Sequence, residues 1–182
     1  MRLFFYGTMR DADVRRMVFG ARAEALIVRP ALLFGFRTCS ARGGDYPVLV
    51  RRTAARARGQ LVEGLGYADL LRLFHFEGPD YLPSRQLAID PSGRRSVAWV
   101  LLSDNAHRAS AHQASTHRAS THQASAKTWR LRQWQLYRKP RMMPRLRIWM
   151  REFDRFEGNS VEITWPVRRR LKAWRESGDL AD

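Results

Sequence analysis

Near its start the chain reads RLFFYGTM, residues 2–9, an apolar and aromatic run that ends at Gly7. This pattern predicts a short buried strand that enters a glycine loop. Glycine allows the backbone to turn sharply, and successive N–H groups in such a turn can hold a carboxylate or another anion. Phosphate is the weaker candidate, because the sequence has neither a GxxxxGK[ST] pattern nor a GxGxxG pattern after the strand.

A helix is expected directly after this loop. Apolar residues recur at helical spacing within residues 14–18, Asp11 or Asp13 can cap the N-terminus, and Gly20 stands where a C-terminal cap belongs.

Residues 25–102 read mainly as strands. Residues 25–37 are rich in Leu, Ile, Val and Phe but contain Pro30 and Gly35, which predicts strands with a break or a bulge. Residues 46–50 and 58–62 are two further strand candidates, and the charged segment between them predicts a hairpin turn.

One helix interrupts this strand-rich region. It is expected over residues 67–76, ended by Gly78-Pro79. Strands return at residues 86–89 and 96–102, separated by a turn at residues 90–93. This order of elements predicts an α+β fold with a small mixed, β-barrel-like sheet and flanking helices.

A tandem repeat follows, with the pentamers HRASA, HQAST, HRAST and HQASA over residues 107–126. A period of five matches neither a helix nor a strand, so the four histidines cannot share one face of regular structure. The tract has no large apolar residue with which to bury a metal site, and we therefore interpret residues 105–127 as a solvated, disordered linker, with metal binding as the alternative.

Residues 128–182 are expected to form a basic helical C-terminal extension, with 1–104 as the main domain. Nine basic residues and no acidic one lie between Lys127 and Arg151. The aromatic and aliphatic stripes of this part predict packing surfaces rather than a base-stacking platform. They comprise Trp129, Leu131, Trp134 and Tyr137, then Leu146, Trp149, Met150, Phe153 and Phe156 after Pro144, and a last helix near Pro166.

Composition sets the remaining limits. The formal net charge is +16, which attracts anions without specificity. Cys39 is the only cysteine, so no internal disulfide is possible, and no run approaches the about 18 apolar residues of a membrane span. We predict a cytoplasmic protein. A thiol nucleophile built from Cys39 and His75 is a poor candidate, because a lone cysteine in strand sequence is more often buried.

The first candidate for proton transfer is Glu77. On the preceding helix, Leu70, Leu73 and Phe74 share one face, and Glu77 follows on the same face at i+7. Burial disfavours the charged form of a carboxylate, and such an acid suits general acid and base catalysis near neutral pH.

Two alternatives remain open for this acid. Glu77 can turn outward at the Gly78 break or pair with Arg72 or Arg85. The triplet Phe-Glu-Gly also recurs at residues 156–158, so that Glu157 has the same local pattern, but it lies beyond the repeat in the basic extension.

Taken together, these motifs resemble a known family. Tyr6-Gly7-Thr8-Met9 is similar to the YG[ST]L signature of the gamma-glutamylcyclotransferase-like (AIG2-like) family, and Phe76-Glu77-Gly78 with Tyr81 is similar to its FEGxxY segment. The resemblance covers about residues 1–102. Met9 replaces the usual leucine, and Phe74 stands where the family commonly has an aspartate.

The resemblance implies an enzyme that cyclises a γ-glutamyl amide or peptide to 5-oxoproline with release of an amine. Glu77 would be the general acid and base, the backbone amides of Gly7, Thr8 and Met9 would hold the α-carboxylate, and Tyr6 and Tyr81 would shape the pocket. No cofactor or metal is implied. The identity of the amine and the oligomeric state stay open.

A second hypothesis comes from another class of protein. The Arg- and Trp-rich C-terminal helices could bind nucleic acid or an acidic partner, or they could cover the mouth of the pocket or mediate self-association.

Overall fold

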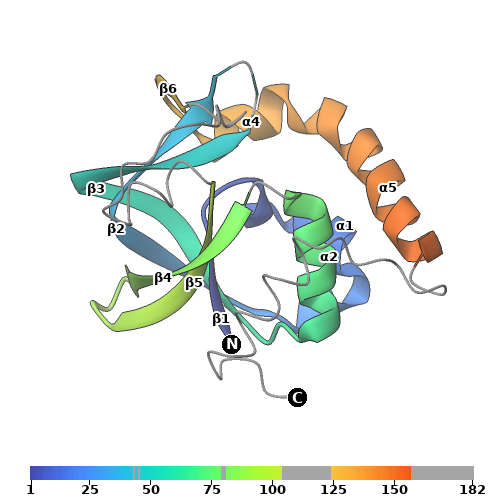
Figure 1. Ribbon diagram of the computed structural model, residues 1–182, viewed down its shortest axis with the longest axis horizontal. Coiled ribbons are helices and arrows are strands. Elements are labelled where there is room, and N and C mark those ends of the chain that lie inside the picture. Colours follow the sequence, from blue (N-terminus) through green and yellow to red (C-terminus); the bar gives the residue numbers. More distant parts are fainter. Residues whose placement is uncertain (43, 45, 79–80, 104–123, 157–182) are drawn as a thin grey trace, which may run out of the picture.

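The computed structural model describes residues 1–42, 44, 46–78, 81–103 and 124–156 (Figure 1). Its centre is a barrel of five strands, which pair in the order β3-β1-β5-β4-β2 and close through a further pairing of β2 with β3. The barrel is mixed, because β1 and β5 are parallel and the other pairs are antiparallel. The strands are β1 (Arg2–Phe5), β2 (Ile27–Ala41), β3 (Pro47–Glu63), β4 (Tyr81–Ile89), β5 (Arg95–Ser103) and β6 (Ala124–Thr128), the last of which pairs with the end of β2.

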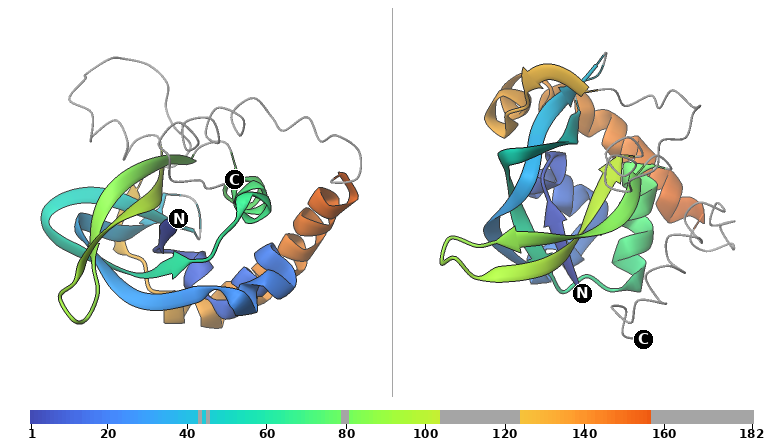
Figure 2. Two further views of the ribbon diagram at one scale, coloured as in Figure 1. Left: turned by 90° about the horizontal axis from the view of Figure 1, so that it is seen from below. Right: turned by 60° about the vertical axis from the view of Figure 1, so that its left-hand side comes forward.

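Helices flank one side of the barrel, as the views of Figures 1 and 2 show. The helices are η1 (Thr8–Arg10), α1 (Ala12–Phe19), η2 (Gly20–Ala25), α2 (Tyr67–Glu77), α4 (Leu131–Tyr137) and α5 (Lys139–Phe156). The predicted α+β fold with a barrel-like sheet and flanking helices is confirmed. Within the described residues, no helix is both long and apolar enough to cross a membrane.

Strand β1 separates two hydrophobic cores because its side chains alternate between the two faces of the sheet. Leu3 and Phe5 lie in the core between the barrel and the helices, and Phe4 and Tyr6 lie in the core that fills the barrel. The strand predicted from the opening run is therefore present, and it is buried on both faces.

Helix α1 begins where the sequence predicts. The Asp11 side chain accepts hydrogen bonds from the amides of Asp13 (3.0 Å) and Val14 (3.2 Å), which identifies Asp11 rather than Asp13 as the N-cap. Gly20 is the C-cap, with φ of 58°, a conformation that glycine adopts without strain.

The long hairpin of β2 and β3 corrects one prediction. The register shifts between Phe34 and Phe36, and Gly35 between them has φ of 77°, so the predicted bulge is present. The two strands expected at residues 46–50 and 58–62 are instead parts of the single strand β3. The charged segment 51–56 is exposed strand, not a turn, and the hairpin partner of β3 is β2.

Helix α2 and the hairpin of β4 and β5 follow the prediction closely. The turn at residues 90–93 closes through a hydrogen bond from the Gly93 amide to the Asp90 carbonyl, and the Asp90 side chain accepts from the amides of Ser92 and Arg94. Strand β4 starts at Tyr81, five residues before the predicted start, so that this tyrosine is fixed in the sheet.

The repeat lies mostly outside the described residues. Its last residues, 124–126, belong to β6, where the prediction placed a linker. The backbone of these residues pairs with the end of β2, and their short Ala and Ser side chains do not hinder an extended conformation. The division of the chain at 104 and 127 stays a prediction.

The C-terminal helices pack against the core, as their apolar stripes predict. Trp129, Trp134, Leu146 and Met150 are buried in the helix-side core. Two details of the prediction are wrong: Tyr137 is 66% exposed and not on the buried face, and α5 begins at Lys139 with Pro144 inside it. The helix expected near Pro166, Glu157 and the Phe156 side chain lie outside the described residues.

Candidate active site

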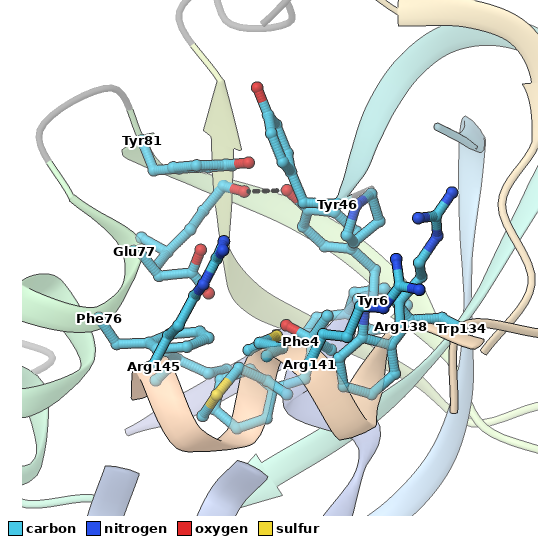
Figure 3. Close-up of a pocket in the computed structure, with 18 residues that line it drawn as sticks. Phe4, Tyr6, Tyr46, Phe76, Glu77, Tyr81, Trp134, Arg138, Arg141 and Arg145 are labelled. Atoms are coloured by element: carbon cyan, nitrogen blue, oxygen red, sulfur yellow. Dashed lines mark hydrogen bonds between the residues drawn. The ribbon is translucent and has the colours of Figure 1, made fainter. Parts of the chain in front are cut away.

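A cavity of about 550 Å³ lies where the open end of the barrel meets the helices (Figure 3). Its volume falls in the range that is usual for small-molecule sites. The walls come from β1 and the following loop, the start of β3, the end of α2, β4, β5, α4 and α5. The residues are Leu3, Phe4, Phe5, Tyr6, Gly7, Thr8, Met9, Tyr46, Pro47, Phe76, Glu77, Tyr81, Leu101, Trp134, Arg138, Arg141, Met142 and Arg145.

The glycine loop forms one wall of the cavity. Gly7 caps the single turn η1, and the amides of Arg10 and Asp11 donate to the carbonyls of Gly7 and Thr8. The first amides of such a turn have no acceptor within it, and they are therefore suited to an anion. A Cβ atom at Gly7 would overlap the ring of Pro47, so only glycine fits at this position.

Tyr6 places a buried hydroxyl group beside the loop. The hydroxyl donates a hydrogen bond of 3.0 Å to the carbonyl of Leu101 on β5. Burial raises the pKa of Tyr6 well above its usual range, and nearby Tyr81 and Glu77 add to this shift. Tyr6 is thus neutral at physiological pH, and its oxygen can only accept a hydrogen bond from a ligand because its proton is already engaged.

Glu77 is the last residue of α2 and is half-buried. The predicted face is confirmed, because Leu70, Leu73 and Phe74 are fully buried. Gly78 ends the helix with φ of 74°, and its amide donates to the carbonyl of Phe74. Figure 3 shows the Glu77 side chain at the cavity, below the ring of Tyr81.

The two arginines that could have paired with Glu77 have other contacts. Arg72 pairs with Asp154 of α5, donates to the carbonyl of Val18 and lies over the ring of Phe153. Arg85 lies over the ring of Trp99. Phe74 stands where the resembled family commonly has an aspartate. It is buried in the helix-side core and does not line the cavity.

All six residues proposed for the site line this one cavity. Tyr6, Gly7, Thr8 and Met9 come from the first strand and loop, and Glu77 and Tyr81 flank the α2–β4 connection. About seventy residues of sequence separate these two groups, so it is the fold that brings them into one cavity. Their roles in catalysis stay a proposal.

The rival chemistries find less support in the geometry. Cys39 is buried in a small cluster with Ala41 and Val48, whereas His75 stacks on Trp149 at 4.5 Å between ring centroids. Within the part of the chain that the structure describes, no three His, Cys, Asp or Glu residues are grouped as metal ligands.

The sequence left open whether the C-terminal helices cover the mouth of the pocket, and it did not identify which of their residues would line it. Arg138, Arg141 and Arg145 line the cavity together with Trp134 and Met142. Arg141 and Arg145 are spaced at i and i+4 and share one face of α5, and Arg138 lies at the junction of α4 and α5. That spacing alone does not say which surface the face opposes.

An ionic cluster fixes these helices to the N-terminal part of the site. Lys139 donates to Asp11 at 2.8 Å and to Asp13 at 2.6 Å, and Gln135 donates to Asp11 at 2.7 Å. Burial alone would raise the pKa of Asp11, but the hydrogen bonds from Lys139, Gln135 and the Val14 amide hold it below its ordinary value. The residue that caps α1 therefore also anchors the wall of the cavity.

A second contact holds α5 against α2. The indole of Trp149 donates to the His75 carbonyl at 3.1 Å, and the His75 ring lies within hydrogen-bonding distance, 3.1 Å, of the Trp149 carbonyl. Trp149 remains 46% exposed, so its inward face serves this stack and not the deep core.

A family model and a curated relative match this chain. The model of the family described as "Gamma-glutamyl cyclotransferase, AIG2-like" matches residues 3–131. Protein AIG2 C of Arabidopsis thaliana is 27% identical over 79 residues, a match that spans 43% of this chain and 46% of that protein, and thus about half the length of this curated relative.

Solved structures are similar in fold. One Arabidopsis thaliana protein, solved in solution, has a TM-score of 0.54 and 16% identity, with 90% of this chain and 89% of that chain covered. A second solution structure from the same organism has a TM-score of 0.52 and 19% identity over 79% of this chain and 85% of its own. At these identities the likeness shows the fold alone.

Proposed function

Because the chain belongs to the gamma-glutamyl cyclotransferase, AIG2-like family, we propose that it cyclises a γ-glutamyl amide or peptide to 5-oxoproline and releases an amine. The observation that carries this proposal is a single cavity lined by both the glycine loop and Glu77, an acid at the end of an apolar helix face. The loop suits the α-carboxylate of a glutamyl head, and the acid suits its α-ammonium group.

The reaction needs a base and then an acid at one place. Glu77 accepts a proton from the α-ammonium, and the freed amine attacks the γ-carbonyl carbon of the same molecule. A carbon–nitrogen bond forms to close the five-membered lactam, and the bond to the leaving nitrogen breaks as Glu77 returns the proton to it. The ring nitrogen gives up its second proton to become the lactam N–H, and the released amine takes up one proton to leave as an ammonium ion.

The cavity lowers the barrier mainly by positioning. Both reacting ends belong to one substrate, and holding them in the attacking geometry removes roughly 7 to 11 kcal/mol of barrier in well-oriented intramolecular reactions. The amides of Gly7, Thr8 and Met9 hold the α-carboxylate, and the Tyr6 oxygen accepts a hydrogen bond from the α-ammonium. Tyr81 covers the acid.

The decisive experiment replaces the acid while keeping its shape. We expect Glu77→Gln to fold normally and to release 5-oxoproline about 10²- to 10⁴-fold more slowly than the parent. Mass detection of 5-oxoproline from a panel of γ-glutamyl compounds measures this and ranks the amines. Glu152→Gln, an exposed glutamate of α5, is the matched control. Unchanged turnover in Glu77→Gln would remove its assigned role.

The alternative, a nucleic-acid-binding protein, loses its stacking platform in the fold. Trp129 and Trp134 are buried, and of the three tryptophans considered for stacking only Trp149 is substantially exposed. Affinity for nucleic acid would fall steeply with added salt and would not depend on Glu77, whereas release of 5-oxoproline requires Glu77, which distinguishes the two functions. The cytoplasmic location stays a prediction from the sequence.

A further inference from the structure

The arginines of the cavity wall carry an inference that deepens the proposed function and rests on it. We propose that the amine half of the substrate is anionic and that Arg141 and Arg145 bind it. The favoured substrates are then γ-glutamyl peptides whose leaving amine bears two or more carboxylates.

The cationic side chains of α5 differ in whether they form ion pairs. Lys139 is neutralised by Asp11 and Asp13. In contrast, Arg141 and Arg145 make no ion pair with any of the described residues, although both line the cavity. Guanidinium groups bind carboxylates in a bidentate manner, so this wall is chemically suited to a carboxylate ligand.

The positive surface continues beyond the first cavity. A second hollow of about 680 Å³ shares Trp134, Arg138 and Arg141 with the first, and Arg42, Lys127 and Arg130 also line it. Among the described residues, no acidic side chain lines this second hollow. A ligand that leaves the first cavity past Arg141 therefore meets further cations, which favours an extended group with more than one negative charge.

The two ends of the cavity suit different parts of the ligand. Glu77 is the only acidic side chain among the described residues of the first cavity, and it belongs with the ammonium of the glutamyl head. The glycine loop supplies amides for the carboxylate of that head. Arg141 and Arg145 lie on α5, which follows the repeat in the sequence. We assign them to the amine half of the substrate.

The test uses two probes of nearly equal shape. γ-Glutamyl-glutamate carries two carboxylates on its amine half, and γ-glutamyl-glutamine amide carries none. We expect the parent protein to prefer the anionic probe in kcat/KM about tenfold or more, as one or two charged hydrogen bonds provide. The preference should shrink with added salt.

The variant Arg141→Gln/Arg145→Gln should lose this preference, so that the ratio of the two kcat/KM values falls towards one. Arg147→Gln is the matched control, because Arg147 is an exposed arginine of the same helix that lines neither hollow. It should keep the ratio of the parent. Circular dichroism and thermal unfolding verify that all variants are folded.

The outcomes separate the two proposals. Equal turnover of both probes by the parent overturns the anionic preference and leaves the cyclotransferase function intact. An equal loss for both probes in the double variant also overturns it, since the arginines would then hold the glutamyl head. If no compound of the γ-glutamyl panel, these two probes included, yields 5-oxoproline, the proposed function fails, and calorimetric titration of the parent and the double variant with γ-glutamyl-glutamate decides about the arginines. Binding that the double variant loses supports the anionic site, and the absence of binding to the parent overturns it.

Discussion

Gly7 connects the barrel to the proposed substrate loop, and its lack of a side chain has a specific structural reason. The backbone at this position lies directly against the ring of Pro47 at the start of β3. Its φ is −115°, an ordinary extended value, so the requirement for glycine comes from the close approach and not from backbone strain.

We expect Gly7→Ala to push the loop away from Pro47. Overpacking of this kind costs about 1 to 3 kcal/mol in the free energy of unfolding, and turnover should fall because the loop amides lose their position. Gly66→Ala is the control, since a Cβ there meets nothing nearer than an Asp69 oxygen at 3.8 Å. That change should cost below about 1 kcal/mol. Urea denaturation and 5-oxoproline release measure both effects, and a Gly7→Ala protein with parental stability and turnover would contradict this account.

At the scale of elements, an ionic cluster joins α5 to α1. Hydrogen bonds from Lys139 lower the pKa of Asp13, and those from Lys139 and Gln135 lower the pKa of Asp11 against the effect of its burial. The pKa of Lys139 is raised: its burial acts against this, but the hydrogen bonds to Asp11 and Asp13 outweigh it. Each depressed carboxyl pKa adds stability that is present above the ordinary Asp pKa and is lost as the pH falls through the folded value.

Lys139→Met should therefore lower the free energy of unfolding at neutral pH by about 1 to 3 kcal/mol, and the difference from the parent should vanish in acid. Once the pH falls through their depressed folded pKa values, both carboxyl groups become protonated, and Lys139 then has no anion to bind. Denaturant unfolding from pH 7 down to about pH 2 tests this. Lys127→Met, at an exposed lysine of β6, is the control. A difference that stays constant over the whole range would show that the lysine acts only through its packing.

The elements also show why some parts of the fold follow from local pattern and others do not. Helix α1 was predictable because its cap, its apolar spacing and its terminal glycine lie within ten residues of one another. Strand β3 was not, because its middle, residues 51–56, is exposed and charged. Arg51 and Arg56 lie over the rings of Phe36 and Phe34 on β2, and this cross-strand partner is what makes the segment a strand.

The same distinction applies to the site in the whole molecule. The loop, Glu77 and Tyr81 could be grouped in advance because short motifs occur in the order of a known family. The arginine wall could not, since the helical spacing of Arg141 and Arg145 defines a face of α5 but does not show which surface that face opposes. Only the packing of α4 and α5 against the core directs that face into the cavity.

Because these helices share a core with the barrel, we expect the described part of the molecule to unfold as one cooperative unit. Leu146 is 5% exposed within the core that contains Leu3, Phe5 and Leu73, whereas Ile148 on the same helix is 60% exposed. We expect Leu146→Ala to lower the free energy of unfolding by about 2 to 5 kcal/mol and Ile148→Ala to change it by no more than about 0.5 kcal/mol.

In the Leu146→Ala variant, the unfolding transition should move to a lower denaturant concentration as a single step. Two of the six tryptophans, Trp134 and Trp149, lie in α4 and α5. Replacing the other four by phenylalanine makes tryptophan fluorescence a probe of these two helices, whereas far-ultraviolet circular dichroism reports on all helices and strands. Coincident midpoints by both probes indicate a two-state transition. A fluorescence transition that precedes the loss of circular dichroism would instead mean that α4 and α5 detach before the barrel unfolds. The arginine wall would then be lost under conditions in which the glycine loop and Glu77 are still in place.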